Sequence, residues 1–182
     1  MNIANIKYND IANGPGVRVS VFVSGCTRHC KDCFNQEAWD FAYGQPMTPQ
    51  RMDQILAGLS PAYVRGLTVL GGEPFEPQNQ PGVLELVRTV RQRLPDKSIW
   101  AFSGYTLDGH LLAGKLGPLE VTRALLEQLD VLVDGPFIAE QKDLNLRFRG
   151  SRNQRLIDMK KTLATGEIVL WQDWQTGKEG EA

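Results

Sequence analysis

The hydrophobic pattern of this chain alternates between a period of two and a helical period, and this alternation limits the folds that it can adopt. The segment VRVSVFVS, residues 17–24, places its valines on one face, which is typical of a β-strand. In TPQRMDQILAGL, residues 48–59, a capping threonine, an early proline and apolar residues at helical spacing predict a helix. The same two patterns then alternate in GLTVLGGEPF (strand), residues 83–94 (helix), SIWAFSG (strand), VTRALLEQL (helix) and DVLVDG (strand).

Such alternation predicts an α/β fold, with mostly parallel strands and crossover helices in either an open sheet or an incomplete barrel. In both architectures, ligands bind at the carboxyl ends of the strands. We therefore expect the turns that follow the strands to share one rim. These turns are the loop that starts at residue 25, GGEP at 71–74, SGY at 103–105 and DGPF at 134–137.

The first of these turns holds Cys26, Cys30 and Cys33, which are the only cysteines in the chain. They lie among polar residues, so packing does not explain the cluster. An odd number of cysteines, in a chain without the pattern of a signal peptide, argues against a disulfide framework and favours metal or redox chemistry.

The number of ligands narrows the choice of metal. Thiolates select zinc or iron–sulfur clusters. Structural zinc needs four ligands, and His29 directly adjoins Cys30, which makes it a poor fourth ligand. A closed [4Fe–4S] cluster normally has four cysteines. Three cysteines therefore favour a cluster with one open iron, where a substrate or cofactor binds; zinc and free thiols stay as alternatives.

The GGEP turn makes the pattern more specific. Two glycines leave backbone groups open to a ligand, although the turn alone would indicate only a connection from strand to helix. Together, C-x3-C-x2-C and the later GGEP resemble the radical S-adenosylmethionine (radical SAM) superfamily. The segment NGPGVRVSVFVSGCTRHCKDCFN resembles the signature of its glycyl-radical-enzyme activating proteins. The later segment VDGPFIAEQKDLNLRFRGSRNQRLID makes the chain most similar to the activating proteins of anaerobic ribonucleoside-triphosphate reductase. This resemblance covers residues 1 to about 160.

The resemblance implies an incomplete (β/α) barrel of radical SAM type and two cofactors, a [4Fe–4S] cluster and S-adenosylmethionine. Cys26, Cys30 and Cys33 would each bind one iron, and the methionyl amino and carboxylate groups of S-adenosylmethionine would chelate the fourth. Gly72 would be the first backbone contact of the methionyl ammonium. The residues expected to contact S-adenosylmethionine are Asp32, Cys33, Phe34, Gly71, Gly72, Glu73, Ser103 and Gly104.

One position departs from the superfamily pattern, because the residue before the last cysteine is often aromatic and here is Asp32. Phe34 would replace that packing against the adenine, or would simply fill the core. Backbone atoms of residues 32–34 are the expected adenine contacts.

The implied reaction starts with one electron from a low-potential donor such as flavodoxin. Reductive cleavage of S-adenosylmethionine then gives a 5′-deoxyadenosyl radical, which abstracts hydrogen from a reductase glycine near the carboxyl terminus. Such chemistry needs no catalytic acid or base. The alternatives are a radical SAM enzyme for another target, such as pyruvate formate-lyase or a small molecule, and a non-catalytic iron–sulfur or zinc module.

Length and composition set the remaining limits. The 182 residues predict a single domain over residues 1–174 and a flexible polar tail over 175–182. The net charge of -1 gives no reason to expect nucleic acid, and no apolar run is long enough to span a membrane. We therefore expect a cytoplasmic protein.

A few other residues carry weaker expectations. Arg18 would be a solvated strand residue, or would support the site. Asp134 would reach the rim or cap a turn. The arginines at 147, 149, 152 and 155 would form a solvated face or a docking surface for the reductase. The four tryptophans, Trp39, Trp100, Trp171 and Trp174, would lie in the core or at subunit contacts.

Overall fold

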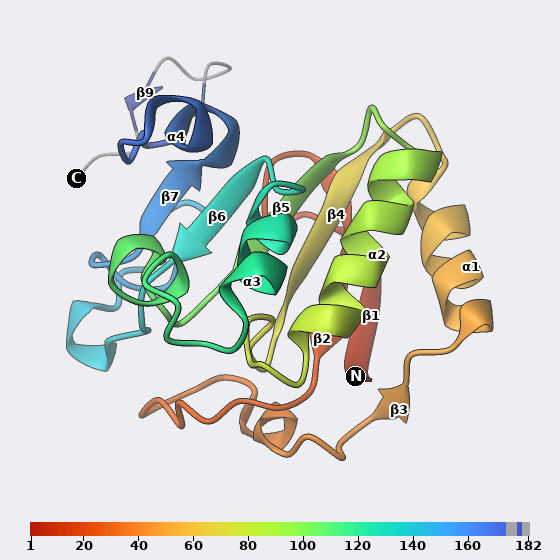
Figure 1. The fold of residues 1–182 in the computed structure, drawn as a ribbon, viewed down its shortest axis with the longest axis horizontal. Coiled ribbons are helices and arrows are strands. Elements are labelled where there is room, and N and C mark those ends of the chain that lie inside the picture. Colours follow the sequence, from red (N-terminus) through yellow and green to blue (C-terminus); the bar gives the residue numbers. More distant parts are fainter. Residues whose placement is uncertain (174–177, 180–182) are drawn as a thin grey trace.

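The computed structural model describes residues 1–173 and 178–179, and its centre is a seven-stranded sheet with the order β3-β1-β2-β4-β5-β6-β7 (Figure 1). The four central strands run parallel: β2 (Val17–Val23), β4 (Val64–Gly71), β5 (Ser98–Phe102) and β6 (Val131–Asp134). The outer strands pair antiparallel: β1 (Asn2–Asp10), β3 (Gln45–Pro46) and β7 (Arg155–Asp158). The prediction of an α/β fold is confirmed. The predicted parallel arrangement is found in the four central strands, whereas the three outer strands pair antiparallel.

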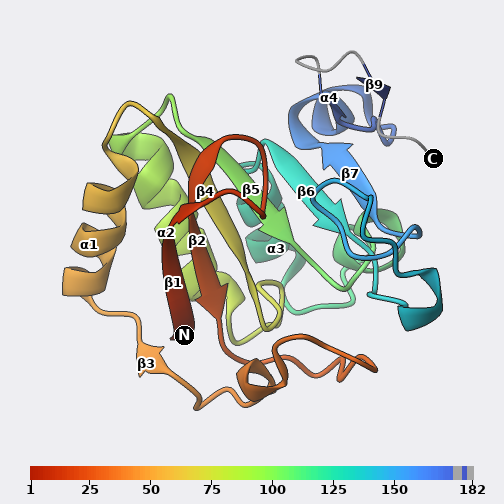
Figure 2. The ribbon, with the colours of Figure 1, turned by 180° about the vertical axis from the view of Figure 1, so that it is seen from behind.

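Each parallel connection is a helix, and all three crossover helices lie on one face of the sheet (Figures 1 and 2). They are α1 (Pro49–Leu59), α2 (Gln80–Arg93) and α3 (Leu119–Leu126). Thr48 caps α1 as predicted, since its hydroxyl accepts a hydrogen bond from the Arg51 N–H at 3.3 Å. The shorter elements are η1 (Gln36–Trp39), η2 (Leu107–Leu111), η3 (Ala139–Gln141), α4 (Met159–Thr165), β8 (Gln172–Asp173) and β9 (Lys178–Glu179). None of the helices in residues 1–173 is long and apolar enough to cross a membrane.

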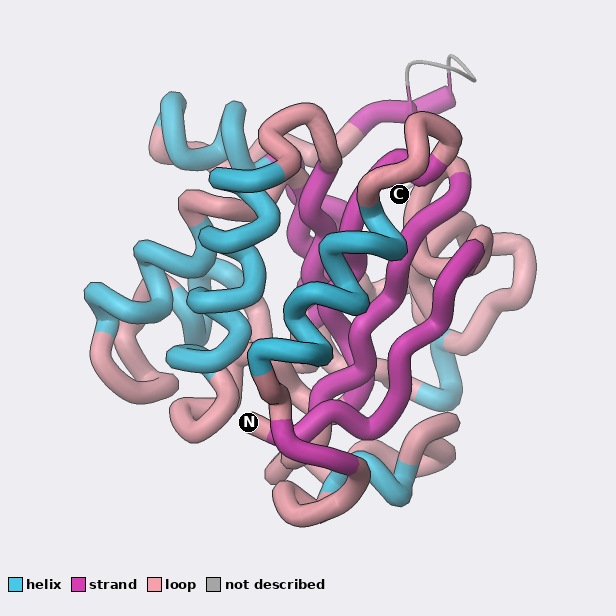
Figure 3. Tube along the Cα trace, turned by 90° about the vertical axis from the view of Figure 1, so that its right-hand side faces the viewer, coloured by secondary structure: helices cyan, strands magenta, loops and turns pink. Residues whose placement is uncertain are grey.

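Strand alternation divides the interior between the two faces of the sheet. Val19, Val21 and Val23 are fully buried on the face that packs against the helices, which confirms the predicted valine face. The next residues along the same strand, such as Phe22, point to the other face. In the described part of the chain, that face carries none of the crossover helices and is covered mainly by loops (Figures 2 and 3). The covering segments are the β1–β2 loop, residues 11–16, and part of the segment 135–154.

The prediction that Arg18 is a solvated strand residue is wrong, because its side chain is completely buried on the loop-covered face. Its guanidinium donates hydrogen bonds to the Thr68 hydroxyl at 2.7 Å, the Ser98 hydroxyl at 2.9 Å and the Leu67 carbonyl at 2.7 Å. Burial lowers the pKa of Arg18 to about 9, so that it is still charged at neutral pH. Arg18 thus ties three parallel strands together.

The carboxyl-terminal part extends the core on the loop-covered face. Trp100 is 2% exposed and packs edge-on against Trp171 at 5.0 Å, as expected for core tryptophans. Trp174 and most of the predicted flexible tail lie outside the described residues. Within that tail, Lys178–Glu179 pair antiparallel with β8.

Candidate functional site

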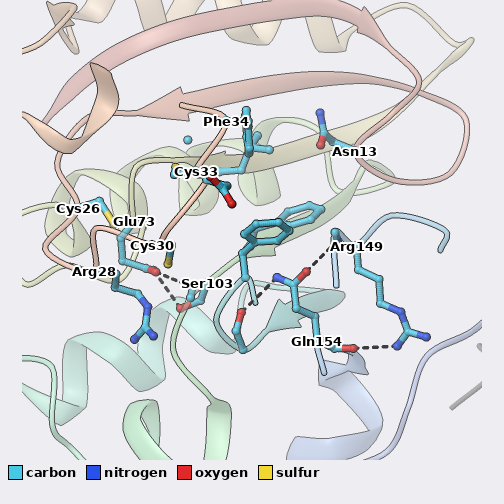
Figure 4. A pocket seen from close by; sticks show the side chains of 18 of the residues that line it. Asn13, Cys26, Arg28, Cys30, Cys33, Phe34, Glu73, Ser103, Arg149 and Gln154 are labelled. Atoms are coloured by element: carbon cyan, nitrogen blue, oxygen red, sulfur yellow. Dashed lines mark hydrogen bonds between the residues drawn. The ribbon is translucent and has the colours of Figure 1, made fainter. Parts of the chain in front are cut away.

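A cavity of about 470 Å³ lies at the carboxyl ends of β2, β4 and β5 and continues over the loop-covered face (Figure 4). All of the predicted site residues line it: Cys26, Cys30, Asp32, Cys33, Phe34, Gly71, Gly72, Glu73, Ser103 and Gly104. The fourth expected turn contributes Gly135. The turns after the four parallel strands therefore do share one rim, as predicted.

The cysteine loop is closed at its base by backbone hydrogen bonds. Gly25 N–H donates to the Ala38 carbonyl at 2.8 Å, and Cys26 N–H donates to the Trp39 carbonyl at 3.1 Å. Inside the loop, the Cys33 N–H donates to the Cys30 carbonyl at 3.2 Å. Figure 4 shows the three cysteine side chains around the same end of the cavity.

His29 is not placed as a fourth ligand of a zinc ion. Its ring stacks on Trp39, with the ring centroids 4.5 Å apart. Among the residues that the structure describes, no three His, Cys, Asp or Glu side chains converge as a single metal ion requires. This arrangement gives no support to a four-ligand structural zinc site, whereas in an iron–sulfur cluster each thiolate binds its own iron.

The protein environment keeps the most buried thiol protonated until a metal binds. Burial raises the pKa of Cys26 to about 11, and the nearby carboxylates of Glu73 and Glu76 act in the same direction. A coordinating metal deprotonates such a thiol. The sulfur of Cys33 accepts a hydrogen bond from the Asn35 N–H at 3.5 Å.

The GGEP turn is bonded to the base of the cysteine loop. Gly72 N–H donates to the Val23 carbonyl at 2.7 Å, and Glu73 N–H donates to the Gly25 carbonyl at 2.8 Å. A Cβ atom at Gly72 would lie 2.5 Å from the Gly25 carbonyl oxygen, so that only glycine fits without displacing the loop. An ammonium only donates hydrogen bonds, so the carbonyl oxygen of Gly72 is the backbone group of this residue that would accept one.

Glu73 joins the GGEP turn to the turn after β5. Its carboxylate accepts hydrogen bonds from the Ser103 hydroxyl at 3.0 Å, the Gly104 N–H at 2.7 Å and the Phe75 N–H at 3.0 Å. The residue is 1% exposed, and burial raises its pKa to about 7 although these hydrogen bonds lower it. Glu73 therefore holds Ser103 and Gly104 in place at the cavity wall (Figure 4).

The raised pKa of Glu73 predicts how stability depends on pH in the metal-free protein. Its contribution is fully present below the unfolded pKa of about 4.5 and is lost as pH rises through the folded pKa of about 7. Between pH 4.5 and 8, the free energy of unfolding should therefore fall by on the order of 3 kcal/mol more than in Glu73→Gln. Urea unfolding of both proteins at several pH values measures the difference, and parallel pH profiles would contradict it.

The sequence analysis did not predict the side chains that pack around the cysteine loop and hold it in place. The Glu76 carboxylate, 4% exposed, accepts hydrogen bonds from the Thr27 N–H at 2.8 Å and the Thr27 hydroxyl at 2.7 Å. The guanidinium of Arg28 lies 4.6 Å from the centre of the Tyr105 ring. A Cβ atom at Gly104 would lie 2.4 Å from Arg28 Cδ, so that the Arg28 side chain packs closely against Gly104. Thr27 and Arg28 lie inside the C-x3-C-x2-C motif, and this position was the one indication in the sequence that they lie near the site.

Asp134, the last residue of β6, bonds to residues far away in the chain and not to the turn that follows it. It is fully buried and accepts hydrogen bonds from the Leu107 N–H at 2.7 Å and from Arg155 Nε at 2.9 Å. The arginines between 147 and 155 do not form one solvated face. Arg152 pairs with Asp143 at 3.1 Å, while Arg149 lines the cavity and donates to the Gln154 carbonyl at 2.8 Å.

Comparison with known proteins decides the family. The family model described as "4Fe-4S single cluster domain" matches residues 12–157. A protein of Vibrio cholerae serotype O1 is 45% identical over 156 residues, which are 85% of this chain and 96% of the relative. It is named anaerobic ribonucleoside-triphosphate reductase-activating protein. This chain belongs to that family. A relative of the same name from Escherichia coli (strain K12) is 41% identical over 85% of this chain and 96% of its own length. Another, from Enterobacteria phage T4, is 37% identical over 86% of this chain and 93% of its own length.

The residues at the cysteine end of the cavity fit an iron–sulfur cluster, as expected for a member of this family. Three thiols, from the only cysteines of the chain, surround one end of the cavity, and the GGEP turn adjoins them. With these three thiols as ligands, one iron of a [4Fe–4S] cluster would have no protein ligand. Phe34 is 81% exposed, so the expectation that it fills the core is wrong.

Proposed function

We propose that this protein activates an anaerobic ribonucleoside-triphosphate reductase by radical SAM chemistry. The observation that carries the proposal is the convergence of the three cysteines, the GGEP turn and the Ser103–Gly104 turn on one cavity. The names of the relatives support the reductase as the partner. When bound, the [4Fe–4S] cluster and S-adenosylmethionine would supply one-electron reductive cleavage to a 5′-deoxyadenosyl radical, the species that abstracts hydrogen from a reductase glycine.

The chain's own residues would bind and orient these cofactors. Cys26, Cys30 and Cys33 would hold the cluster. The Gly72 carbonyl would accept a hydrogen bond from the methionyl ammonium, and Gly71 and Glu73 complete that turn. Ser103 and Gly104, fixed by Glu73, would form the adjoining wall. Residues 32–34 would contact the adenine, with the exposed Phe34 ring available to pack on it.

The proposed radical chemistry does not depend on a histidine as catalytic acid or base. Neither histidine of the chain lines the cavity. His29 stacks on Trp39, and the Nδ1 atom of His110 lies 2.9 Å from the Thr106 hydroxyl. Abstraction of a hydrogen atom needs no proton acceptor, so the protein's part is to position the cofactors and to exclude water.

The family resemblance extends the proposal to the whole chain. We assign residues 1–174 to a single radical SAM domain with the curvature of an incomplete (β/α) barrel. The partners would be the glycyl-radical subunit of the reductase and a low-potential electron donor such as flavodoxin. The cytoplasm is the proposed compartment.

An anaerobic assay of the reconstituted protein tests the proposal. With iron, sulfide, dithionite and S-adenosylmethionine, we expect 5′-deoxyadenosine, and a glycyl-radical doublet in the electron paramagnetic resonance (EPR) spectrum only when the reductase is added. Cleavage without that doublet would remove the reductase as target and leave pyruvate formate-lyase or a small molecule. Absence of both a cluster and cleavage would favour the non-catalytic module.

A further inference from the structure

A positively charged side chain lies at the cysteine end of the cavity without an anionic partner. Arg28 stands midway between Cys26 and Cys30 in the sequence and lines the cavity with them. Among the residues that the structure describes, no carboxylate lies within ion-pair distance of its guanidinium, and its buried Nε atom has no hydrogen-bond acceptor. An arginine at a cavity wall stays protonated at neutral pH, so its charge acts at this end of the cavity.

The surrounding turns hold the Arg28 side chain in place. Its guanidinium lies 4.6 Å from the centre of the Tyr105 ring, and a Cβ atom at Gly104 would lie 2.6 Å from Arg28 Nε. The Tyr105 hydroxyl in turn lies 3.3 Å from the hydroxyl of Thr27, in the cysteine loop. Figure 4 shows Arg28 beside Glu73, at the same end of the cavity as the cysteines. The charge of Arg28 therefore has a fixed place next to the cysteine loop.

A second cation of the cysteine loop is in a different environment. The Lys31 side chain is 77% exposed and does not line the cavity, and its ammonium lies 3.6 Å from the Glu140 carboxylate. Water and this carboxylate screen its charge. Arg28, by contrast, is partly buried and unpaired, and charges interact more strongly where water is excluded. The two cations should therefore differ in their electrostatic effect on a group bound by the three cysteines.

We propose that Arg28 raises the reduction potential of the [4Fe–4S] cluster and thereby increases the fraction of the protein that a low-potential donor can reduce. Net charge and solvent exposure are among the factors that set the potential of such a cluster. The electron from the donor adds a negative charge to those of the thiolates, so a fixed cation stabilises the reduced form more than the oxidised form. Glu73 and Glu76, when ionised, act in the opposite direction. This inference rests on the proposed function, because it needs a cluster bound by the three cysteines.

A redox titration followed by EPR tests the inference on the cluster-loaded protein without S-adenosylmethionine. At a potential that reduces half of the unmodified protein, we expect the ratio of reduced to oxidised cluster in Arg28→Gln to be at least tenfold lower, a shift of about 59 mV for one electron. Lys31→Gln removes the other charge from the same loop and should change this ratio by less than about twofold. Arg28→Lys keeps the charge and should retain most of the original potential.

A second pair of variants tests the inference with the cysteine loop unchanged. Tyr105→Leu removes the ring that holds the guanidinium, whereas Tyr105→Phe keeps the ring and removes only the hydroxyl. We expect a more negative midpoint potential in Tyr105→Leu, by less than in Arg28→Gln, and an unchanged potential in Tyr105→Phe. This pair decides the question if Arg28→Gln fails to bind a cluster.

Equal midpoint potentials in the unmodified protein, Arg28→Gln and Tyr105→Leu would overturn the inference. An equally large decrease in Lys31→Gln and Arg28→Gln would also overturn it, because any charge in the loop would then have the same effect. The proposed function fails separately, if the cluster-loaded unmodified protein yields no 5′-deoxyadenosine. An unmodified protein that binds no cluster would overturn both.

Discussion

Cys30→Ser is expected to leave a folded protein that assembles no stable [4Fe–4S] cluster and forms no detectable 5′-deoxyadenosine. The chain has three cysteines and no spare one, and among the described residues no three His, Cys, Asp or Glu side chains are arranged to hold a single metal ion in their place. A serine hydroxyl is a harder and far less acidic ligand than a thiol, and iron–sulfur clusters select thiolates. Iron and sulfide content after reconstitution, with the EPR spectrum of the reduced protein, measures the loss.

His29→Ala is the control for this variant, because it lies inside the same loop and adjoins Cys30. Its ring stacks on Trp39, so removing it should loosen the loop without removing a ligand. We expect iron and sulfide contents close to those of the unmodified protein. If His29→Ala lost its metal as completely as Cys30→Ser, or if Cys30→Ser kept a full cluster, the assignment of three cysteine ligands would be wrong.

Arg18→Ala should lower the free energy of unfolding by about 3–5 kcal/mol. The side chain is fully buried, and its guanidinium donates to groups of Thr68, Ser98 and Leu67 on two neighbouring strands. Its removal leaves these acceptors without their donor and opens a cavity. Gly14 packs closely against the same side chain, since a Cβ atom there would lie 2.8 Å from Arg18 Cδ. The β1–β2 loop would therefore lose its support as well.

Urea unfolding of the metal-free proteins measures this loss. Arg88→Ala, on the exposed side of α2, is the matched control and should change stability by no more than about 0.5 kcal/mol. Arg18→Lys should fall between the two, because an ammonium retains the charge but cannot reproduce the planar set of hydrogen bonds. If the Arg18→Ala protein were as stable as the Arg88→Ala control, the buried hydrogen bonds of Arg18 would make no net contribution to the free energy of unfolding.

The parallel core of the fold was predictable from local patterns. Alternating valines placed β2, and a threonine cap with apolar residues at helical spacing placed α1. Strand β1 was missed, because its burial follows no regular alternation and its pairing with β2 is interrupted by irregularities. Antiparallel β7 was not predicted either, since its place at the sheet edge depends on a distant partner, β6.

The sequence by itself determined the α/β fold, the positions of the cysteine loop and the GGEP turn, and their meeting at one rim. Local periodicity decides where strands and helices form, and parallel strands must end at the same edge. Only the tertiary structure decided that Arg18 is buried, that Glu73 bonds to Ser103 and Gly104, and that part of the segment between β6 and β7 lines the cavity. These outcomes depend on contacts between residues far apart in the chain, and such contacts leave no periodic signal in the sequence.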